Sequence, residues 1–350
     1  MTLRLLADDL TGALDSAAAF CGGGAVCVFL APPPVLPAGP AAIDLGCRDG
    51  SEAAAVAATA AAAPLLAGAG IAFLKIDSLL RGHWAAMLAA LWRRGGFRHC
   101  VFAPAFPAQG RVTRQGRQFL READGTLRPV TVDPRAALAA QGVTEIAVQD
   151  AAVEAELRAV VARGRALSGP VLWCGTAGLA MALADRPPPV VTRLPAPALA
   201  VIGSNHAVAL AQLRTLADAS GTAPLRLRGA DGEVAEVSAR LCHPGCVVQA
   251  DIPAGTAPDA AAARIAAVLR ATLPRLARPA TLIAAGGETL RSACEALGVA
   301  RLDVDGAMAP GVPCSRLVGG VWDGVRVVSK SGAFGAPDLL ARLFAAVAAL

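Results

Sequence analysis

The stretch Leu3-Arg-Leu-Leu-Ala-Asp-Asp-Leu-Thr-Gly-Ala13 joins a short apolar run to a helix-forming segment through a pair of carboxylates. Leu3–Ala7 predicts a buried β-strand, and Thr11–Cys21 predicts a helix that begins just after Asp8 and Asp9. A buried strand that turns directly into a helix is the repeating unit of α/β proteins. The stretch therefore predicts an α/β fold with a mainly parallel sheet.

The same alternation continues along the chain and is interrupted once, by a Pro-rich segment at 187–198 that predicts an extended linker. We therefore expect two α/β domains, 1–186 and 199–350, each a mainly parallel sheet flanked by helices, with a cleft between them. The further strands expected are 25–30, 41–45, 71–76, 100–103, 171–174, 199–202, 225–228, 246–250, 281–285 and 325–329. The further helices expected are 52–66, 84–92, one from 177, 207–217, 257–273, 290–297 and 337–350.

Composition excludes several classes of protein. With 350 residues, 55% of them hydrophobic and 17% charged, the chain is too apolar to be disordered. It has no run of about 18 uncharged apolar residues, and Asp8 and Asp9 interrupt any secretory signal, so we expect no membrane partner. The nine Cys suit reduced thiols in a cytoplasmic protein. Aromatic residues make up 4% and Tyr is absent, which argues against a nucleic-acid partner.

Lysine is scarce in a way that points to particular sites. Of 32 basic residues only Lys75 and Lys330 are Lys, and the rest are Arg. In such a chain a retained Lys indicates a place where a compact ammonium is needed, although retention by chance is the alternative. Both lysines fall inside motif-like segments, which favours the functional interpretation.

Asp8 and Asp9 lie where the first predicted strand ends, and ligands of parallel sheets bind beyond such ends. The pair could bind a polyol, hold Mg²⁺ through water or supply a general base. The structural alternative is that one Asp caps the following helix.

The segment Leu74-Lys-Ile-Asp-Ser-Leu-Leu-Arg-Gly-His83 concentrates charged and hydroxyl groups at another strand end. Lys75 and Asp77 are two residues apart and so face the same side of the strand. With Ser78 and Arg81 in the turn, the segment suits a small hydroxylated acid. A surface ion-pair cluster is the alternative.

A third segment, Ala103 to Arg117, predicts a strand running into a Pro/Gly loop that bears Arg111, Arg114 and Arg117. The three arginines could clamp a phosphate or carboxylate, or they could simply be solvated.

Gly is coupled with Ser or Thr at the ends of several later strands, in a pattern that favours phosphate binding. Backbone N–H groups at such turns, with the dipole of the helix that follows, attract anions. Neither domain begins with a Walker A or Rossmann fingerprint. Cys242-His-Pro-Gly-Cys246 lacks a partner pair at metal-binding spacing, so we interpret it as structural. The turns are 175–178, 203–206, 286–289 and 329–335.

Taken together, several of these motifs resemble the four-carbon acid sugar kinase family, which includes the 3-oxo-tetronate, D-threonate and D-erythronate kinases. They occur in the family's order from residue 5 to about residue 340. The chain departs from the family pattern at His83-Trp84 and at Cys314. The matching segments are Ala7–Ala13, Lys75–Gly82, Ala103–Pro107 with Gly110-Arg111, Gly286–Thr289, Pro310–Pro313 and Lys330–Gly335.

The resemblance implies an N-terminal domain that binds a sugar acid and a C-terminal domain that binds ATP. It implies transfer of the ATP γ-phosphoryl group to the terminal hydroxyl of a four-carbon acid. It carries over Asp9, Arg48 and the turn 75–81 to the substrate site, and Ser204, Gly286–Thr289 and Gly332 to the nucleotide site. We expect ATP and Mg²⁺ as cofactors, with Glu288 or Asp8 holding the metal through water, and a sugar acid as the partner. A homodimer is compatible with the sequence.

The motifs and the resemblance together give the expected site. As catalytic residues we expect Asp9, Lys75 and Asp77. As substrate-binding residues we expect Asp8, Asp9, Arg48, Lys75, Asp77, Ser78, Arg81 and Arg111. As nucleotide-binding residues we expect Ser204, Gly286, Gly287, Glu288, Thr289, Lys330, Ser331 and Gly332. The alternatives are a sensor that binds both ligands without transfer, a kinase for another small hydroxy acid, and a dinucleotide oxidoreductase, whose fingerprint is missing.

Overall fold

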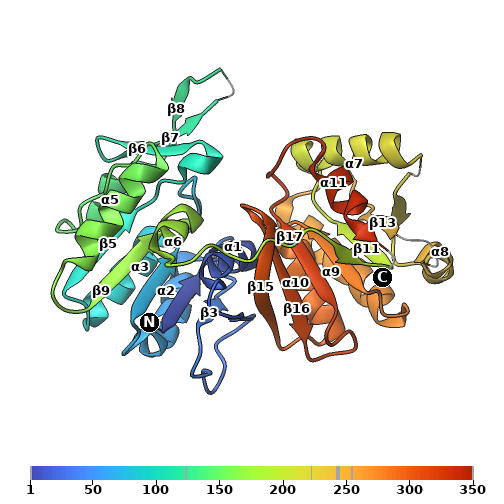
Figure 1. The fold of residues 1–350 in the computed structure, drawn as a ribbon, viewed down its shortest axis with the longest axis horizontal. Helices are drawn as coiled ribbons and strands as arrows, with labels where there is room; N and C mark the ends of the chain where they lie inside the picture. The colour runs from blue at the N-terminus through green and yellow to red at the C-terminus, as the bar shows by residue number, and fades with distance from the viewer. Residues whose placement is uncertain (1, 123, 222, 242–244, 254, 349–350) are drawn as a thin grey trace. The chain divides into compact units, whose positions relative to one another are not determined.

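The computed structural model describes residues 2–122, 124–221, 223–241, 245–253 and 255–348. The chain divides into two compact units, residues 1–188 and 189–350 (Figure 1). The Pro-rich segment expected to be a linker packs on the second unit. There Val191 N–H donates to the Ala307 carbonyl at 2.9 Å, and strand β10 (Leu194–Pro195) pairs with β18 (Val347–Ala348).

The first unit contains a six-stranded, entirely parallel sheet in the order β2-β3-β1-β4-β9-β5. Since all strands run the same way, their carboxyl ends share one edge. The central strands are buried on both faces, which explains their continuous apolar runs. The strands are β1 (Leu3–Ala7), β2 (Val26–Phe29), β3 (Ala41–Asp44), β4 (Ile71–Lys75), β5 (His99–Ala103) and β9 (Val171–Gly175).

The helices of the first unit form two groups. In one group α6 contacts both α1 and α5, and in the other α3 contacts both α2 and α4. The core beneath α3 includes Trp84, whose ring stacks on Phe102 with centroids 5.1 Å apart. The helices are α1 (Leu10–Phe20), α2 (Glu52–Ala62), α3 (Trp84–Arg94), α4 (Pro134–Ala140), α5 (Glu154–Arg165) and α6 (Ala177–Leu183), with 3-10 turns η1 (Ala63–Leu66) and η2 (Pro107–Gln109).

The predicted Arg-bearing loop is wrong, because the segment forms a small antiparallel sheet. Strands β6 (Arg111–Arg114), β7 (Arg117–Arg121) and β8 (Leu127–Pro129) pair in sequence order. Arg114 pairs with Arg117 across the turn, whereas Arg111 lies at the base of the hairpin. The strands are short and rich in charged residues, so the sequence shows no alternation of polar and apolar residues that would predict them.

The second unit has a seven-stranded sheet in the order β12-β13-β11-β14-β17-β16-β15. The first five strands are parallel, and β17, β16 and β15 pair antiparallel. The prediction of an α/β fold with mainly parallel sheets is confirmed. The strands are β11 (Ala198–Ile202), β12 (Leu225–Leu227), β13 (Gly245–Ala250), β14 (Thr281–Ala285), β15 (Arg301–Ala309), β16 (Val312–Val318) and β17 (Arg326–Lys330).

Five helices and a 3-10 turn accompany this sheet among the described residues. The expected terminal helix 337–350 is shorter than predicted: it ends at Ala345, and the short strand β18 follows. The helices are α7 (Ala207–Ser220), α8 (Asp231–Leu241), α9 (Pro258–Thr272), α10 (Gly287–Leu297) and α11 (Leu339–Ala345), with η3 (Leu273–Arg275).

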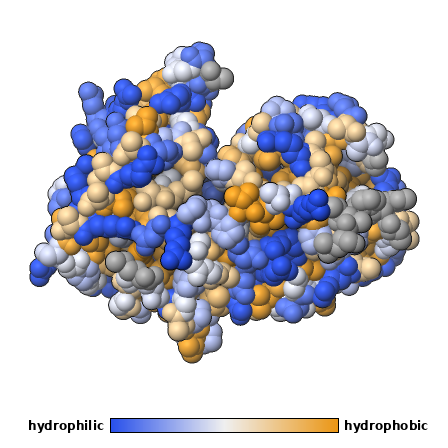
Figure 2. Space-filling model, viewed as in Figure 1, coloured by the Kyte–Doolittle hydropathy of each residue, from blue (hydrophilic) through white to orange (hydrophobic). Residues whose placement is uncertain are grey.

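The outer surface mixes hydrophilic and apolar residues on the face shown in Figure 2. In the described part of the chain, every helix is too short or too polar to cross a lipid bilayer.

Helix α5 packs so tightly on the sheet that its Gly164 has no room for a side chain. An added Cβ would lie 2.4 Å from the Trp173 ring and 3.0 Å from Val101. We expect Gly164→Ala to destabilise the first unit, because overpacking costs about 1–3 kcal/mol while helix propensity returns at most about 1 kcal/mol. Calorimetry should show a lower Tm, by about 2–4 °C per kcal/mol.

The matched control is Gly232→Ala in helix α8, where no atom lies within 4 Å of the added Cβ. That variant gains helix propensity without a clash, so its Tm should stay level or rise. Equal effects of the two substitutions would contradict the packing argument.

Candidate functional site

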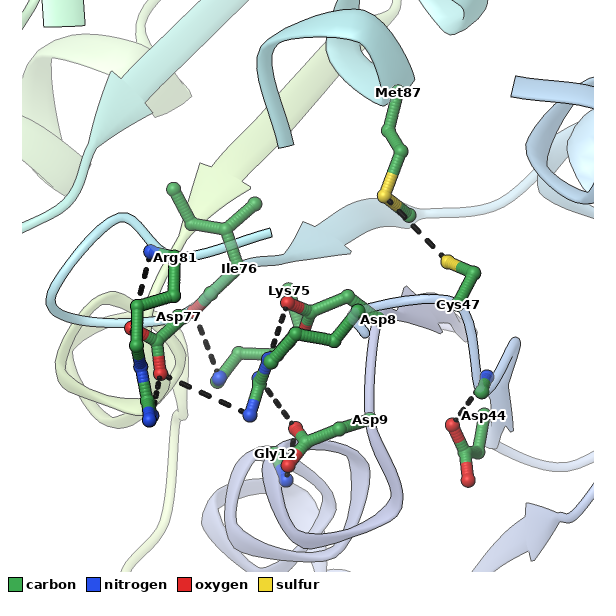
Figure 3. A network of polar contacts seen from close by, with 12 residues as sticks. Asp8, Asp9, Gly12, Asp44, Cys47, Lys75, Ile76, Asp77, Arg81 and Met87 are labelled. Carbon is green, nitrogen blue, oxygen red and sulfur yellow. Dashed lines mark hydrogen bonds and ion pairs between the residues drawn. The ribbon is translucent and has the colours of Figure 1, made fainter. Parts of the chain in front are cut away.

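The charged residues predicted in the first unit converge at the carboxyl edge of its sheet. Asp8 and Asp9 follow β1, Arg48 follows β3, and Lys75 ends β4, with Asp77 two residues further on. Figure 3 shows the side chains of Asp8, Asp9, Lys75 and Asp77 pointing toward one another. The adjacency of β3, β1 and β4 in the sheet brings these segments together although they are far apart in sequence.

Arg48 holds the carboxylates of the site in place. Its Nε and Nη2 donate to both oxygens of Asp8 at 2.8 and 2.7 Å, and Nη2 also donates to Asp9 Oδ1 at 2.6 Å. Nη1 lies 3.8 Å from Asp77 Oδ1. Burial lowers the pKa of Arg48, but the neighbouring carboxylates outweigh it and raise the pKa overall. The guanidinium was expected to bind a substrate carboxylate, yet here it faces carboxylates of the protein.

Asp8 and Asp9 are adjacent but differ in burial and in their contacts. The Asp8 side chain is 0% exposed and has both oxygens bonded to Arg48, whereas that of Asp9 is 22% exposed. Burial raises the pKa of Asp8, although Arg48 counteracts it. Asp9 caps α1 by accepting from Gly12 N–H at 2.9 Å through Oδ1. Its Oδ2 accepts no hydrogen bond from the described residues, so Asp9 is both the helix cap and the carboxylate that faces outward.

Asp77 is fixed as a carboxylate by the turn that follows β4. It accepts from Arg81 Nη2 at 2.6 Å and Nε at 3.0 Å, and from Leu79 N–H at 2.9 Å. Burial raises the pKa of Asp77, but hydrogen bonds from Arg81 and the charge of Arg48 outweigh it, so the pKa lies well below its usual range. Asp77 therefore suits an electrostatic role better than a proton-accepting one. Ser78 is half-buried, and its carbonyl accepts from Gln118 Nε2 at 3.0 Å.

Lys75 and Asp9 both approach Gly12. Lys75 is 6% exposed, and its Nζ donates to the Ile76 carbonyl at 2.8 Å. A Cβ on Gly12 would lie 2.5 Å from Asp9 Oδ1 and 2.7 Å from Lys75 Nζ. The positions of both side chains therefore require glycine at this helical position.

Of the three hairpin arginines, Arg111 is the one that belongs to the site. It is half-buried, and Asp77 and Arg81 act on its charge. Its Nη1 donates to the Gln109 carbonyl, and its buried Nε has no hydrogen-bond partner among the described residues. Burial lowers the pKa of Arg111. Arg114 and Arg117 are exposed at the turn of the hairpin.

The predicted nucleotide residues gather at the carboxyl edge of the second sheet. A Cβ on Gly332 would lie 2.3 Å from Ser204 Oγ, and one on Gly203 would lie 2.3 Å from Thr289 Oγ1. The Gly286 N–H donates to the Lys330 carbonyl at 2.9 Å, which joins the turn after β14 to the end of β17. The turns after β11, β14 and β17 therefore contact one another, as neighbouring parallel strands require.

The start of α10 is suited to an anion. Its N-cap is Gly286, at φ 109°, and no side chain of the described residues forms a hydrogen bond that caps this helix start. The N–H groups and the dipole of a helix start attract negative charge. Glu288 is exposed in this first turn, and Thr289 is buried.

Two glutamines that sequence reasoning missed hold the loops of these sites. Gln212 Nε2 donates to the carbonyls of Phe334, Gly335 and Ala336 at 3.1, 3.2 and 2.9 Å, which fixes the loop after Ser331 and Gly332. Gln118 similarly joins the hairpin to the turn at Ser78. Neither lies in a motif, so no sequence signal marks them.

The remaining candidates add no second site. His206 is the N-cap of α7, where its Nδ1 accepts from Val208 N–H at 3.2 Å. Cys242 and His243 of the candidate metal motif lie outside the described residues. Among the residues that the structure does describe, no group of three or more His, Cys, Asp or Glu side chains could hold a metal ion.

Comparison with known proteins defines the class. Residues 3–135 match the sugar-binding N-terminal domain family, and residues 199–340 match the nucleotide-binding C-terminal domain family. The chain is 31% identical to a D-threonate kinase of Cupriavidus necator, over 97% of this chain and 96% of that protein. It is 30% identical to a D-threonate kinase of Bordetella bronchiseptica, over 99% and 97%. The chain belongs to the four-carbon acid sugar kinase family.

Solved structures share the fold. A protein of Salmonella typhimurium LT2 has a TM-score of 0.71 at 22% identity, over 97% of this chain and 98% of its own. A Haemophilus influenzae protein has a TM-score of 0.69 at 20% identity, over 97% and 99%.

Gly12→Ala tests whether Asp9 and Lys75 must keep their positions. The added methyl group would displace both side chains, and a shift of about 1 Å at a reacting centre can cost roughly 10²-fold in rate. We therefore expect a loss of kcat of about that size, measured as phosphorylation of a four-carbon acid. The Tm should fall as well, because the clash outweighs the gain in helix propensity, so kcat is measured at a temperature where the variant is folded.

The control is Gly23→Ala, which has no atom within 4 Å of the new Cβ and should retain activity. Full activity of Gly12→Ala would show that the present positions of Asp9 and Lys75 are not needed.

Proposed function

We propose that the chain is an ATP-dependent kinase that phosphorylates the terminal C4 hydroxyl of a four-carbon sugar acid such as threonate, erythronate or 3-oxo-tetronate. The first unit binds the acid and the second binds ATP. The observation that carries the proposal is the convergence of Asp9, Lys75 and Asp77 at the carboxyl edge of the first sheet, where Asp9 is partly exposed. The D-threonate kinases that cover nearly the whole chain support the substrate class.

The cations at the edge of the first sheet hold the acid. Lys75 uses one of its three N–H donors for the Ile76 carbonyl, which leaves two for a ligand. Arg111 is half-buried near Asp77 and Arg81, and the Arg81 side chain is 62% exposed. We assign these groups to the carboxylate and hydroxyls of the substrate. Arg48 acts as a positioning residue, because its Nε and Nη2 are already bonded to Asp8 and Asp9.

Asp9 is the catalytic base of the proposed reaction. The C4 oxygen forms a bond to the γ-phosphorus, the bond from that phosphorus to the β,γ-bridging oxygen breaks, and the hydroxyl proton passes to Asp9 Oδ2. Arg48 and Gly12 hold Oδ1 and so orient the outward oxygen. Phosphoryl transfer depends mostly on positioning and on neutralising charge, which suits this dense ionic cluster.

The second unit supplies phosphate donors. Backbone N–H groups of 286–289 and 331–332, with the hydroxyls of Ser204 and Thr289, bind the phosphates of ATP. Mg²⁺ neutralises phosphate charge when bound, and it typically takes one or two carboxylates besides phosphates and water. Glu288 is the carboxylate that we assign to it. Asp8 is not, because Arg48 occupies both of its oxygens.

Asp9→Asn separates the proposed base from the helix cap. Asn caps helices as well as Asp does, so α1 and stability should be preserved. We expect kcat to fall by about 10²–10⁴-fold, as for loss of a general base, with nucleotide affinity unchanged. Steady-state ADP release and calorimetric titration with Mg-ADP measure the two quantities.

Asp133→Asn is the matched control, because Asp133 caps α4 in the same way, accepting from Arg135 and Ala136 N–H. It should leave kcat unchanged. Retained activity of Asp9→Asn, or an equal loss of nucleotide binding, would disprove the base assignment.

The substrate is identified by ADP release from Mg-ATP against a panel of threonate, erythronate and 3-oxo-tetronate stereoisomers, with product mass as confirmation. Release that depends on one acid and yields one added phosphate is expected. Nucleotide binding without release for any acid would favour a sensor over a kinase.

A further inference from the structure

The two lysines of the chain are built into the fold in the same way. Lys75 ends β4 and Lys330 ends β17, each in a parallel arrangement with a neighbouring strand. Both are buried, with 6% and 1% of their surface exposed. Each donates Nζ to the carbonyl of the next residue, Ile76 or Ser331, at 2.8 Å. In a chain whose other basic residues are Arg, this repetition indicates a common purpose.

The two ammonium groups differ in their counter-charges. The charge of Lys75 helps to lower the pKa of Asp8 and of Asp77, and its Nζ lies beside Gly12, as does Asp9 Oδ1. Lys330 forms no ion pair with any residue that the structure describes. Burial lowers its pKa to about 8, and no charged side chain contributes to that shift. A buried ammonium without a counter-ion is costly, because it has lost the water that would stabilise its charge.

The surroundings of Lys330 are the turns that we assign to ATP phosphates. Its carbonyl accepts from Gly286 N–H, and its Nζ is bonded to Ser331, beside Gly332. Gly332 in turn approaches Ser204 closely. Lys330 is the only Lys or Arg in these turns. Their carboxylate, Glu288, is exposed, whereas Lys330 is buried and forms no ion pair among the described residues.

We propose that the Lys330 ammonium is the buried counter-charge of the nucleotide phosphates, and that the protein takes up a proton at Lys330 when a nucleotide binds above neutral pH. The proposal rests on the ATP-binding function assigned to the second unit. Lys330 is a positioning residue for that function, since the phosphates gain its charge across the turn at Ser331.

The choice of Lys over Arg follows from this role. A guanidinium keeps its proton at any accessible pH and needs space for a planar fork, whereas an ammonium is compact and loses its charge readily when buried. When the site is empty, Lys330 can therefore lose its proton, which removes part of the free-energy cost of burying its charge. Phosphate binding restores the charged form by supplying the counter-charge.

The sign of the pH dependence follows from the free protein. Below a pKa of about 8, Lys330 is already charged and nucleotide binding needs no proton. Above it, each binding event must first protonate the amine, so affinity falls as pH rises. If the bound form stays protonated, the Kd should rise roughly tenfold between pH 7 and pH 9.

Other titratable groups lie on the elements around Lys330 and need controls. His206 precedes α7, Glu288 begins α10, Cys314 lies on β16 beside Val328, and Asp338 precedes α11. At pH 9 imidazole is neutral, carboxylates are ionised and nucleotide phosphates have lost their last proton. The Cys314 thiol and the His206 imidazole are therefore replaced in control variants.

The experiment is calorimetric titration of the full chain with Mg-ADP, in two buffers of different ionisation enthalpy, at pH 7 and pH 9. The difference in apparent enthalpy gives the protons taken up. We expect roughly none at pH 7 and roughly one at pH 9. Cys314→Ala and His206→Gln should keep the uptake. A wild-type protein that binds Mg-ADP at pH 9 without proton uptake would overturn the proposal, whatever the variants do.

Two substitutions then assign the proton. Lys330→Met should abolish the uptake and weaken binding at pH 7 by about tenfold, as expected for a lost charge-assisted contact. Lys330→Arg keeps a charge that cannot titrate, so it should take up no proton, and its affinity, whatever its level at pH 7, should not fall between pH 7 and pH 9. Uptake that persists in either variant would place the proton elsewhere and contradict the proposal. Failure of the wild type to bind Mg-ADP at all would instead disprove the ATP-binding function.

Discussion

The ion pairs of Arg48 are the interaction on which the first unit's site depends. A parallel sheet brings the ends of β1, β3 and β4 to one edge, and so brings Asp8, Asp9 and Asp77 within reach of one another. Carboxylates this close repel each other and cannot all remain charged without a cation among them. Arg48 is that cation, because its planar guanidinium donates to both oxygens of Asp8 and also to Asp9. A Lys, with one compact charge, could not match this geometry.

Once Arg48 has fixed the carboxylates, the roles of the remaining groups follow from exposure. Asp8 is fully buried and holds Arg48 in place, whereas Asp9 is partly exposed and presents one oxygen outward. Asp77 is neutralised by Arg81 and shapes the turn after β4. Lys75 and Arg111 then remain as cations with donors to spare. The cluster thus offers cations to an acid and one carboxylate oxygen to a hydroxyl.

Much of this could be predicted from the sequence, because the residues that decide the fold also decide the site. Leu3–Ala7 and Ile71–Lys75 read as buried strands from their apolar runs, and the charged residues directly after them had to meet at one edge. The hairpin β6–β7 could not be predicted in this way, since Arg111-Val-Thr-Arg114 carries no clear alternation. Strand β15 was missed although Arg301-Leu-Asp-Val-Asp305 alternates polar and apolar residues, with Leu302 and Val304 buried. The hydrogen-bond partners of individual side chains could not be predicted from the sequence either. Arg48 was expected to face a ligand, and only the structure shows that it faces Asp8 and Asp9.

The two units differ in how their buried lysines are balanced. In the proposed reaction each unit binds an anion at the carboxyl edge of a parallel sheet, and each has a buried Lys at a strand end there. The proposed base lies in the first unit, where Lys75 is near carboxylates and Arg48 offsets their negative charge. Lys330 in the second unit has no carboxylate partner among the described residues. On this proposal the charge that balances Lys75 belongs to the chain, whereas the charge that balances Lys330 comes with the ligand.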